Sequence, residues 1–197
     1  QGGNPNFVIY QVGAGVVGSL QLNSGGVMGD VTLNGNYAYV SSTSDSAEIV
    51  IVNITNKNSP SVTGSVNVAG SGDIYGMKLS GNYLYAVRSG DASNPELVVY
   101  DVSNPTSPSL VGSANSPSNT LYNFIEISGN YAFVSCASDS AELVVYDISN
   151  PASPSQVGTF DATGTGDGVV LKYYDNKIVL GRSTGLMDII NVSNPLA

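Results

Sequence analysis

One segment recurs along this chain and constrains its fold more than any other feature. The sequence AELVVYDISNPASPSQVGTF at residues 141–160 returns with changes at 95–114 and 47–66, and a shortened copy begins at Gly185. The full copies start with an apolar run that ends at a turn containing Pro, which fixes φ and cannot donate to a sheet ladder. A second apolar run follows. The repeat therefore predicts two strands joined by a turn, several times over.

Two series of residues show that the repeat has a fixed, slightly uneven period. Successive members of both series are 46, 48 and 46 residues apart. Because the two series belong to different parts of the repeat, their common rhythm indicates one structural unit copied along the chain. The first series is Gly35, Gly81, Gly129 and Asp175, and the second is Gly18, Gly64, Gly112 and Gly158.

Each period contains four apolar runs, which we name A to D in chain order. The A runs lie at 31–33, 76–79, 124–127 and 169–173, and a Gly-Asn or Asp-Asn pair that favours a tight hairpin leads into each B run. The C runs resemble LVVYD and the D runs contain VGS-like segments. β-Branched and aromatic residues fill these runs, and none has a helical period. The pattern predicts an all-β protein, a β-propeller with one four-stranded antiparallel blade per period.

The blocks GNYAYV, LVVYDVSNP and SLVGS resemble the LVIVD-repeat β-propellers, a group of mostly secreted or surface-exposed bacterial and archaeal proteins. The resemblance covers residues 26–194. It implies a propeller and brings no catalytic residues with it. The sequence departs from the pattern at both ends: the copy at 7–22 has Gly13-Ala14-Gly15 in place of the Ser-Asn-Pro turn, and the last copy ends before its D run.

The repeat also predicts how the single propeller domain divides. We expect C- and D-type strands in 1–25, then blades at 26–70, 71–117, 118–163 and 164–197. Polar residues also match at 94 residues, the sum of two periods, which indicates a doubled two-blade unit. The simplest ring has four blades, the last completed by the N-terminal D-type strand. A piece of a larger ring is the alternative.

This ring leaves one strand over, because both ends of the chain carry a C-type run. Gln11 and Asn191 occupy the same repeat position, so one of the two runs must be displaced. A displaced apolar strand is a partner for another sheet edge. We therefore expect strand donation between subunits, and alternatively an edge strand added to the chain's own blade or a piece of a larger propeller. The expected assembly strand comprises Phe7, Val8, Ile9, Tyr10 and Val12.

Several loops carry side-chain oxygens of the kind that bind Ca²⁺. A simpler explanation is that these polar residues form hairpin tips exposed to water. Two loops, 44–48 and 138–142, each offer two carboxylates, in a spacing that matches no known calcium loop. We therefore expect no metal site, with these loops and the two Gly-rich turns before A strands as secondary candidates. The carboxylates concerned are Asp45, Asp139, Asp73 and Asp167.

One A-strand position, expected near the propeller axis, is polar in every blade. One interpretation is a Lys–Glu pairing that neutralises buried charge, and the other is a polar channel mouth that binds an anion. Arg88 and Arg182 end B strands, where they would pair with loop carboxylates or line a rim. The residues at the A-strand position are Thr32, Lys78, Glu126 and Lys172.

Several common kinds of site are excluded or explained by the repeat. The chain has no histidine, which excludes His-based triads and haem ligation. The match to GxGxxG at 13–18 lacks a following helix, so a dinucleotide site is not expected. We predict that Cys136 is a buried thiol in a strand. Asn53 and Asn191 begin N-glycosylation sequons, which Asx-turn chemistry explains equally well.

The composition limits the classes of function that we expect for this chain. Only 11% of residues are charged, against about 25% in typical globular proteins, and the net charge is −9. A neutral polar surface suits an extracellular or assembled protein, and an acidic chain has no basic stripe for nucleic acid. We expect no cofactor, no membrane insertion and no enzymatic activity, but an extracellular or cell-surface structural or adhesive subunit, self-assembling into a filament or surface layer. The alternative is a monomeric module that binds a glycan, peptide or metal at the propeller rim, and an enzyme using acidic residues is the third choice.

Overall fold

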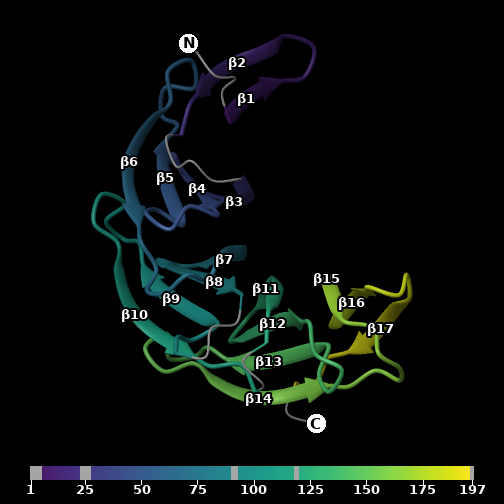
Figure 1. The fold of residues 1–197 in the computed structure, drawn as a ribbon. Helices are drawn as coiled ribbons and strands as arrows, with labels where there is room; N and C mark the ends of the chain where they lie inside the picture. The colour runs from purple at the N-terminus through teal and green to yellow at the C-terminus, as the bar shows by residue number, and fades with distance from the viewer. Residues whose placement is uncertain (1–5, 23–27, 90–92, 118–119, 196–197) are drawn as a thin grey trace.

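The computed structural model describes residues 6–22, 28–89, 93–117 and 120–195, and in these the chain forms five antiparallel sheets along an open arc (Figure 1). The first sheet is a hairpin, the next three are four-stranded blades, and the last has three strands. The predicted all-β, propeller-type fold is confirmed. In the described part of the chain, no helix is long and apolar enough to cross a membrane.

The strands of each blade follow one another in chain order, from the inside of the arc outwards (Figure 1). All the strands of the complete blades fall within the predicted bounds. The hairpin is β1 (Phe7–Gln11) and β2 (Gly15–Leu20). The complete blades are β3 (Met28–Asn34), β4 (Tyr37–Ser42), β5 (Ile49–Asn53) and β6 (Ser61–Val66); β7 (Ile74–Ser80), β8 (Tyr83–Arg88), β9 (Leu97–Asp101) and β10 (Ser109–Ala114); and β11 (Tyr122–Ser128), β12 (Tyr131–Cys136), β13 (Leu143–Asp147) and β14 (Ser155–Phe160). The last sheet is β15 (Gly168–Tyr174), β16 (Lys177–Arg182) and β17 (Met187–Asn191).

The A–B turns take the conformation that their residues favour. Gly35, Gly81 and Gly129 have φ between 54° and 59°, a region that glycine enters at no steric cost. Asp175 and Asn176 both have positive φ, as the central residues of a type I′ turn require. These tight turns set the register of the A and B strands.

The core lies between blades, so the C strands are buried on both faces. Val98 and Tyr100 of β9 pack with Ile51 of the preceding blade, whereas Val99 packs with Val144 of the following one. Burial on both faces explains why these strands read as continuous apolar runs instead of alternating with polar residues.

The D-strand glycines allow each blade to dock on the next. Gly112 lies opposite Val99 beside a β-bulge, and a Cβ there would collide with the backbone carbonyl of Pro151 in the next C–D turn. Gly64 and Gly158 face the carbonyls of Pro105 and Pro195 in the same way. The second periodic glycine series therefore marks the contact between the D strand of one blade and the turn of the next.

The closed four-blade ring and its closure by the N-terminal D-type strand are wrong. β2 pairs with β1 in a local hairpin, and the ends of the arc do not meet (Figure 1). Gly18 in β2 packs against the carbonyl of Lys57, so the hairpin occupies the place of an outer half-blade before the first complete blade. Closing a hairpin across a three-residue turn costs far less entropy than reaching the far end of the arc. The strand at 7–12 is accordingly paired and not displaced.

Candidate functional site

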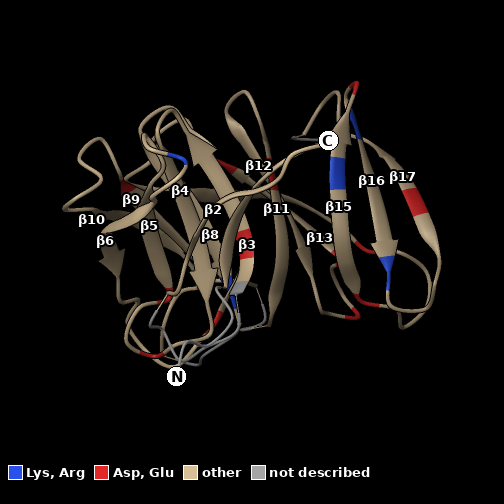
Figure 2. Cartoon of the chain, turned by 90° about the horizontal axis from the view of Figure 1, so that it is seen from above, with Lys and Arg blue, Asp and Glu red and all other residues tan. Residues whose placement is uncertain are grey.

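The inner strands β3, β7, β11 and β15 stand side by side along the concave side of the arc (Figure 1). Charged residues are sparse over the whole chain, and one of the basic ones lies in the middle of β15 (Figure 2). Because charges are so few, each charged side chain on this concave surface has a large effect on its electrostatic potential.

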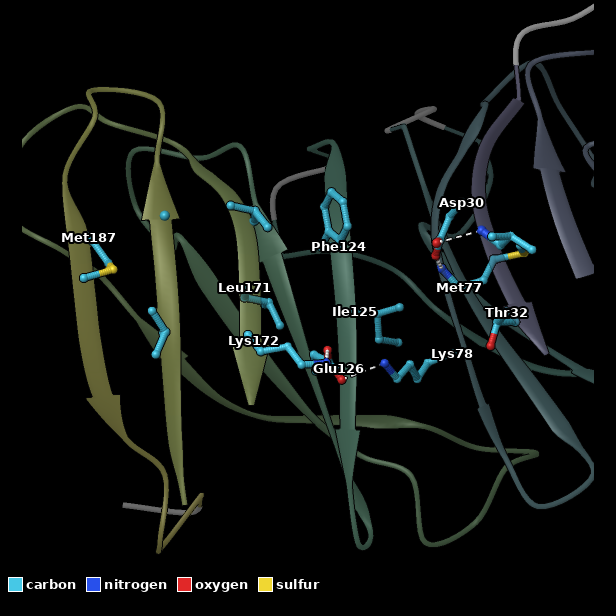
Figure 3. Close-up of a pocket in the computed structure, with 14 residues that line it drawn as sticks. Asp30, Thr32, Met77, Lys78, Phe124, Ile125, Glu126, Leu171, Lys172 and Met187 are labelled. Carbon is cyan, nitrogen blue, oxygen red and sulfur yellow. Dashed lines mark hydrogen bonds and ion pairs between the residues drawn. The ribbon is translucent and has the colours of Figure 1, made fainter. Parts of the chain in front are cut away.

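The four polar residues at the shared A-strand position form one row across these strands (Figure 3). Lys78 Nζ lies 2.9 Å from Glu126 Oε2, and Lys172 Nζ donates to Glu126 Oε1 at 2.5 Å. The predicted Lys–Glu pairing is thus present. The Glu126 side chain is 11% exposed, whereas those of Lys78 and Lys172 are 35% and 69% exposed. Two ammonium groups share one carboxylate, so this row alone has one positive charge in excess, and the Asp30 carboxylate in the same groove balances it.

A groove of about 520 Å³ runs along this row (Figure 3). Its walls include the partly exposed side chains of Phe124, Val170 and Met187. The site therefore combines a polar row with apolar walls, an arrangement suited to binding a small molecule.

Asp30 also lines the groove but is already engaged by the backbone. Its Oδ2 accepts the N–H of Met77 at 2.8 Å, and its Oδ1 accepts the N–H of Val31 at 2.8 Å. Ser41 Oγ accepts the N–H of Asp30. This carboxylate ties the first complete blade to the second, a role that the sequence analysis missed.

The two B-strand arginines hold loops and do not line a rim. Arg88 is fully buried and donates from Nε to Pro95 O at 2.8 Å and from Nη1 to Ala69 O. Arg182 donates from Nε to the carbonyl of Gly166 at 3.0 Å, and its Nη1 lies 3.6 Å from a carboxylate oxygen of Asp188 in β17. Both arginines bond to backbone carbonyls, a role that charge-pair reasoning did not include.

Three buried glutamates were also missed. Glu48, Glu96 and Glu142 precede successive C strands, and the Oε2 of each accepts a backbone N–H twenty residues further on, at 2.6 to 2.7 Å. Asn6 makes the equivalent contact with Leu22 in the hairpin. Their spacing of 48 and 46 residues, equal to the period, is the feature that could have revealed this role.

The candidate calcium carboxylates lie in loops at two kinds of position. Asp45 and Asp139 are exposed at two B–C hairpin tips, and Asp73 and Asp167 are half-buried before their A strands. Within the described ranges, no three His, Cys, Asp or Glu side chains are arranged to hold a metal ion. The serines on either side of Asp45 and of Asp139 bond to each other, as Ser44 does with Ser46 at 3.1 Å.

The sequon asparagines form the predicted Asx turns. Asn53 Oδ1 accepts the N–H of Thr55 at 2.9 Å, and Asn191 Oδ1 accepts that of Ser193 at 3.1 Å. Asp101 and Asp147 make the same contact in the other blades, and hydrogen bonds from the residue two positions on lower the pKa of both carboxyl groups. Glycosylation at the two asparagines stays a prediction.

Two further motifs have structural explanations. The GxGxxG match forms the β1–β2 turn and the start of β2, and a strand follows it where a dinucleotide site needs a helix. Cys136 is buried in β12, where its Sγ lies 2.9 Å from Thr120 Oγ1, and burial raises the pKa of the thiol to about 11. Such a thiol has little thiolate at neutral pH, in line with the predicted structural role.

The predicted assembly strand lies at one end of the arc. Phe7, Val8 and Ile9 are half-buried, with Phe7 packed against the first complete blade, whereas Tyr10 and Val12 are 72% and 102% exposed. At the other end, two apolar side chains of β17 are also exposed, Met187 at 65% and Ile189 at 64%.

Comparison with known proteins supports the repeat and the fold. A family described as LVIVD repeat matches residues 25–68, 71–116 and 123–162. No curated protein matches the chain. The crystal structure of the computationally designed Ika8 protein is similar with a TM-score of 0.70 and 14% identity, over 95% of this chain and 52% of that chain. The designed Ika4 protein is similar with a TM-score of 0.67 and 14% identity, over 90% of this chain and 98% of that one. The chain thus spans about half the length of Ika8.

Proposed function

The chain belongs to the LVIVD-repeat family, and from that premise we propose that it is a non-enzymatic extracellular structural subunit that assembles end to end with further copies of itself. The sparsely charged, acidic composition supports an extracellular setting. The observation that carries the proposal is that, within the described residues, the hairpin at one end of the arc lacks inner strands and the sheet at the other end lacks an outer strand.

The N-terminal hairpin supplies the outer two strands of a blade. β1 and β2 pack on the back of the first complete blade as C and D strands do elsewhere, but no described strand stands beside β1 on its inner side. A cavity of about 520 Å³ lies there, lined by Val31 and Leu33 of β3. These side chains are 55% and 63% exposed, whereas Met77, the equivalent of Val31, is 3% exposed. The inner strands of another blade would cover them.

The C-terminal sheet supplies the inner strands of a blade. β15, β16 and β17 correspond to A, B and C strands, and in the described part of the chain β17 pairs with β16 alone. The apolar side chains Met187 and Ile189 occupy positions that a following blade covers in the complete blades. An open strand edge next to an apolar face is a template for pairing with another chain.

We therefore place the strand at 7–12 of one subunit against the free edge of β17 of the next, by β-augmentation, which gives a five-stranded composite blade because both strands are of the C type. The composite blade then places the C-terminal sheet beside Val31 and Leu33 of the partner copy, so that one contact covers the exposed apolar faces of both ends. Repetition of this contact produces a filament or sheet, and closure after a few copies produces a ring.

Electron microscopy and light scattering of the purified chain test this assembly. We expect filaments or rings, and their loss on deletion of residues 1–12 or in the Ile189→Lys variant. Leu110→Lys is the matched control, because Leu110 is 58% exposed in β10, away from both ends. Monodisperse single arcs of the unaltered chain at high concentration would overturn the proposal, as would assemblies that Ile189→Lys leaves intact.

A further inference from the structure

The row on the concave surface carries more positive charge than its pairing requires. The chain has 6 Lys and Arg residues against 15 Asp and Glu, yet two of the lysines converge on one carboxylate. A pair that served to neutralise buried charge would need one lysine. Lys172 is 69% exposed and has little desolvation cost to offset.

Glu126 orients both ammonium groups without exhausting them. Each ammonium has three N–H donors, and each lysine gives Glu126 one contact. Asp30, the other carboxylate that lines the groove, accepts two backbone N–H groups, one at each oxygen. The two lysines therefore keep N–H donors that Glu126 does not use, while the four charged groups that line the groove, two lysines and two carboxylates, sum to zero.

The surface beside the lysines is apolar. Phe124 of β11 and Val170 of β15 are 40% and 47% exposed, and both line the same groove (Figure 3). An inorganic anion would make no use of these walls, and a neutral apolar molecule would make no use of the lysines. The geometry points to a site for a small organic anion, with its carboxylate held by Lys78 and Lys172 and a flat apolar body against Phe124 and Val170.

The site goes beyond the proposed function and does not depend on it. The residues proposed to hold the anion lie on β7, β11 and β15, whereas the groove that they line also reaches Val31 and Met187, which the proposed assembly uses. Titration of the dispersed chain therefore tests ligand binding apart from assembly.

Titration with 2-naphthoate, with the neutral isostere 2-naphthamide as control, tests the site by amide chemical shifts. To keep the sample dispersed, the chain carries Ile189→Lys, which lies outside the proposed site. We expect saturable shifts on β7, β11 and β15 with the carboxylate, and affinity lower by about tenfold for the amide, since charge-assisted hydrogen bonds are worth that much.

Lysine variants assign the effect to the row. Lys78→Met and Lys172→Met keep the side-chain stem and should each weaken 2-naphthoate by about tenfold. Lys177→Met is the control, because Lys177 contacts Asp175 at the β15–β16 turn and does not line the groove. Absence of saturable shifts up to the solubility of the ligand would overturn the inference. Equal affinity for the amide, or shifts that Lys78→Met and Lys172→Met leave unchanged, would overturn it as well.

Discussion

The third complete blade and the last sheet carry apolar side chains at the same C-strand positions, and their surroundings differ. Leu143 and Val145 of β13 are 1% and 5% exposed because β15 and β16 cover them, whereas Met187 and Ile189 of β17 are 65% and 64% exposed. Burial of a strand in this fold is therefore decided by the next blade and not by the strand's own composition. Such dependence on nearest neighbours is typical of repeat architectures.

The largest expected effect tests this contrast directly. Leu143→Ala should lower the free energy of unfolding by about 2–5 kcal/mol, because it opens a cavity between two blades. Met187→Ala, at the equivalent exposed position, should change it by less than about 0.5 kcal/mol in the dispersed chain. Urea unfolding of both variants measures the difference. Similar losses for the two substitutions would mean that β17 has a cover that the structure does not describe.

The docking glycines offer a second comparison between the interior and an end. In Gly112→Ala the new methyl group collides with the carbonyl of Pro151, and we expect a loss of about 1–3 kcal/mol from overpacking. In Gly18→Ala the same collision with Lys57 should detach the hairpin and leave the complete blades folded. Limited proteolysis should then cut Gly18→Ala near the N-terminus, with thermal unfolding of the remainder unchanged. Global unfolding of Gly18→Ala at lower temperature would contradict this.

Alkaline pH should loosen an interior interface through a hydrogen-bonded tyrosine pair that the last sheet lacks. The hydroxyl groups of Tyr122 and Tyr146 lie 2.6 Å apart, and Tyr146 donates to Asn115 O at 2.9 Å. Burial raises the pKa of both, that of Tyr146 to about 12 from its ordinary value of 10.0. Because the unfolded tyrosines lose protons first, the stability that the pair contributes is complete below pH 10 and falls as pH rises towards 12.

Urea unfolding at pH 8, 10 and 11 checks this dependence. Tyr146→Phe should reduce the alkaline slope by about one proton and cost about 1 kcal/mol at pH 8, where the hydrogen bonds are intact. An unchanged slope in Tyr146→Phe would assign the alkaline loss to other groups. Tyr174→Phe, at a 74% exposed position in β15, is the matched control.

The repeat in the sequence predicted the strands and the residues that recur with the period. It did not predict the curvature of the arc or the burial of individual side chains. Gly64 and Gly112 marked the period correctly, and the shared A-strand position correctly predicted that Lys78, Glu126 and Lys172 lie together. The openness of the arc could not be predicted, because the angle between blades depends on packing that no periodicity expresses. Glu96 was missed for a related reason: an exposed carboxylate at a loop tip and a buried one that accepts a backbone N–H look alike in sequence.

The smallest expected effect concerns the C–D turns, where the interior blade has Asp147 and the last sheet has Asn191. Hydrogen bonds from Ser149 lower the pKa of Asp147, so the carboxylate contributes stability above the ordinary value of 3.8 and loses it as pH falls. Asn191 accepts the corresponding N–H without titrating.

Asp147→Asn should therefore flatten the acid limb of thermal unfolding between pH 5 and pH 2, and Asn191→Asp should steepen it if the last turn is as well formed as the interior ones. A steeper limb in Asp147→Asn alone would show that its carboxylate destabilises the turn. Since Asp147 is only partly buried, solvent screening keeps either change small.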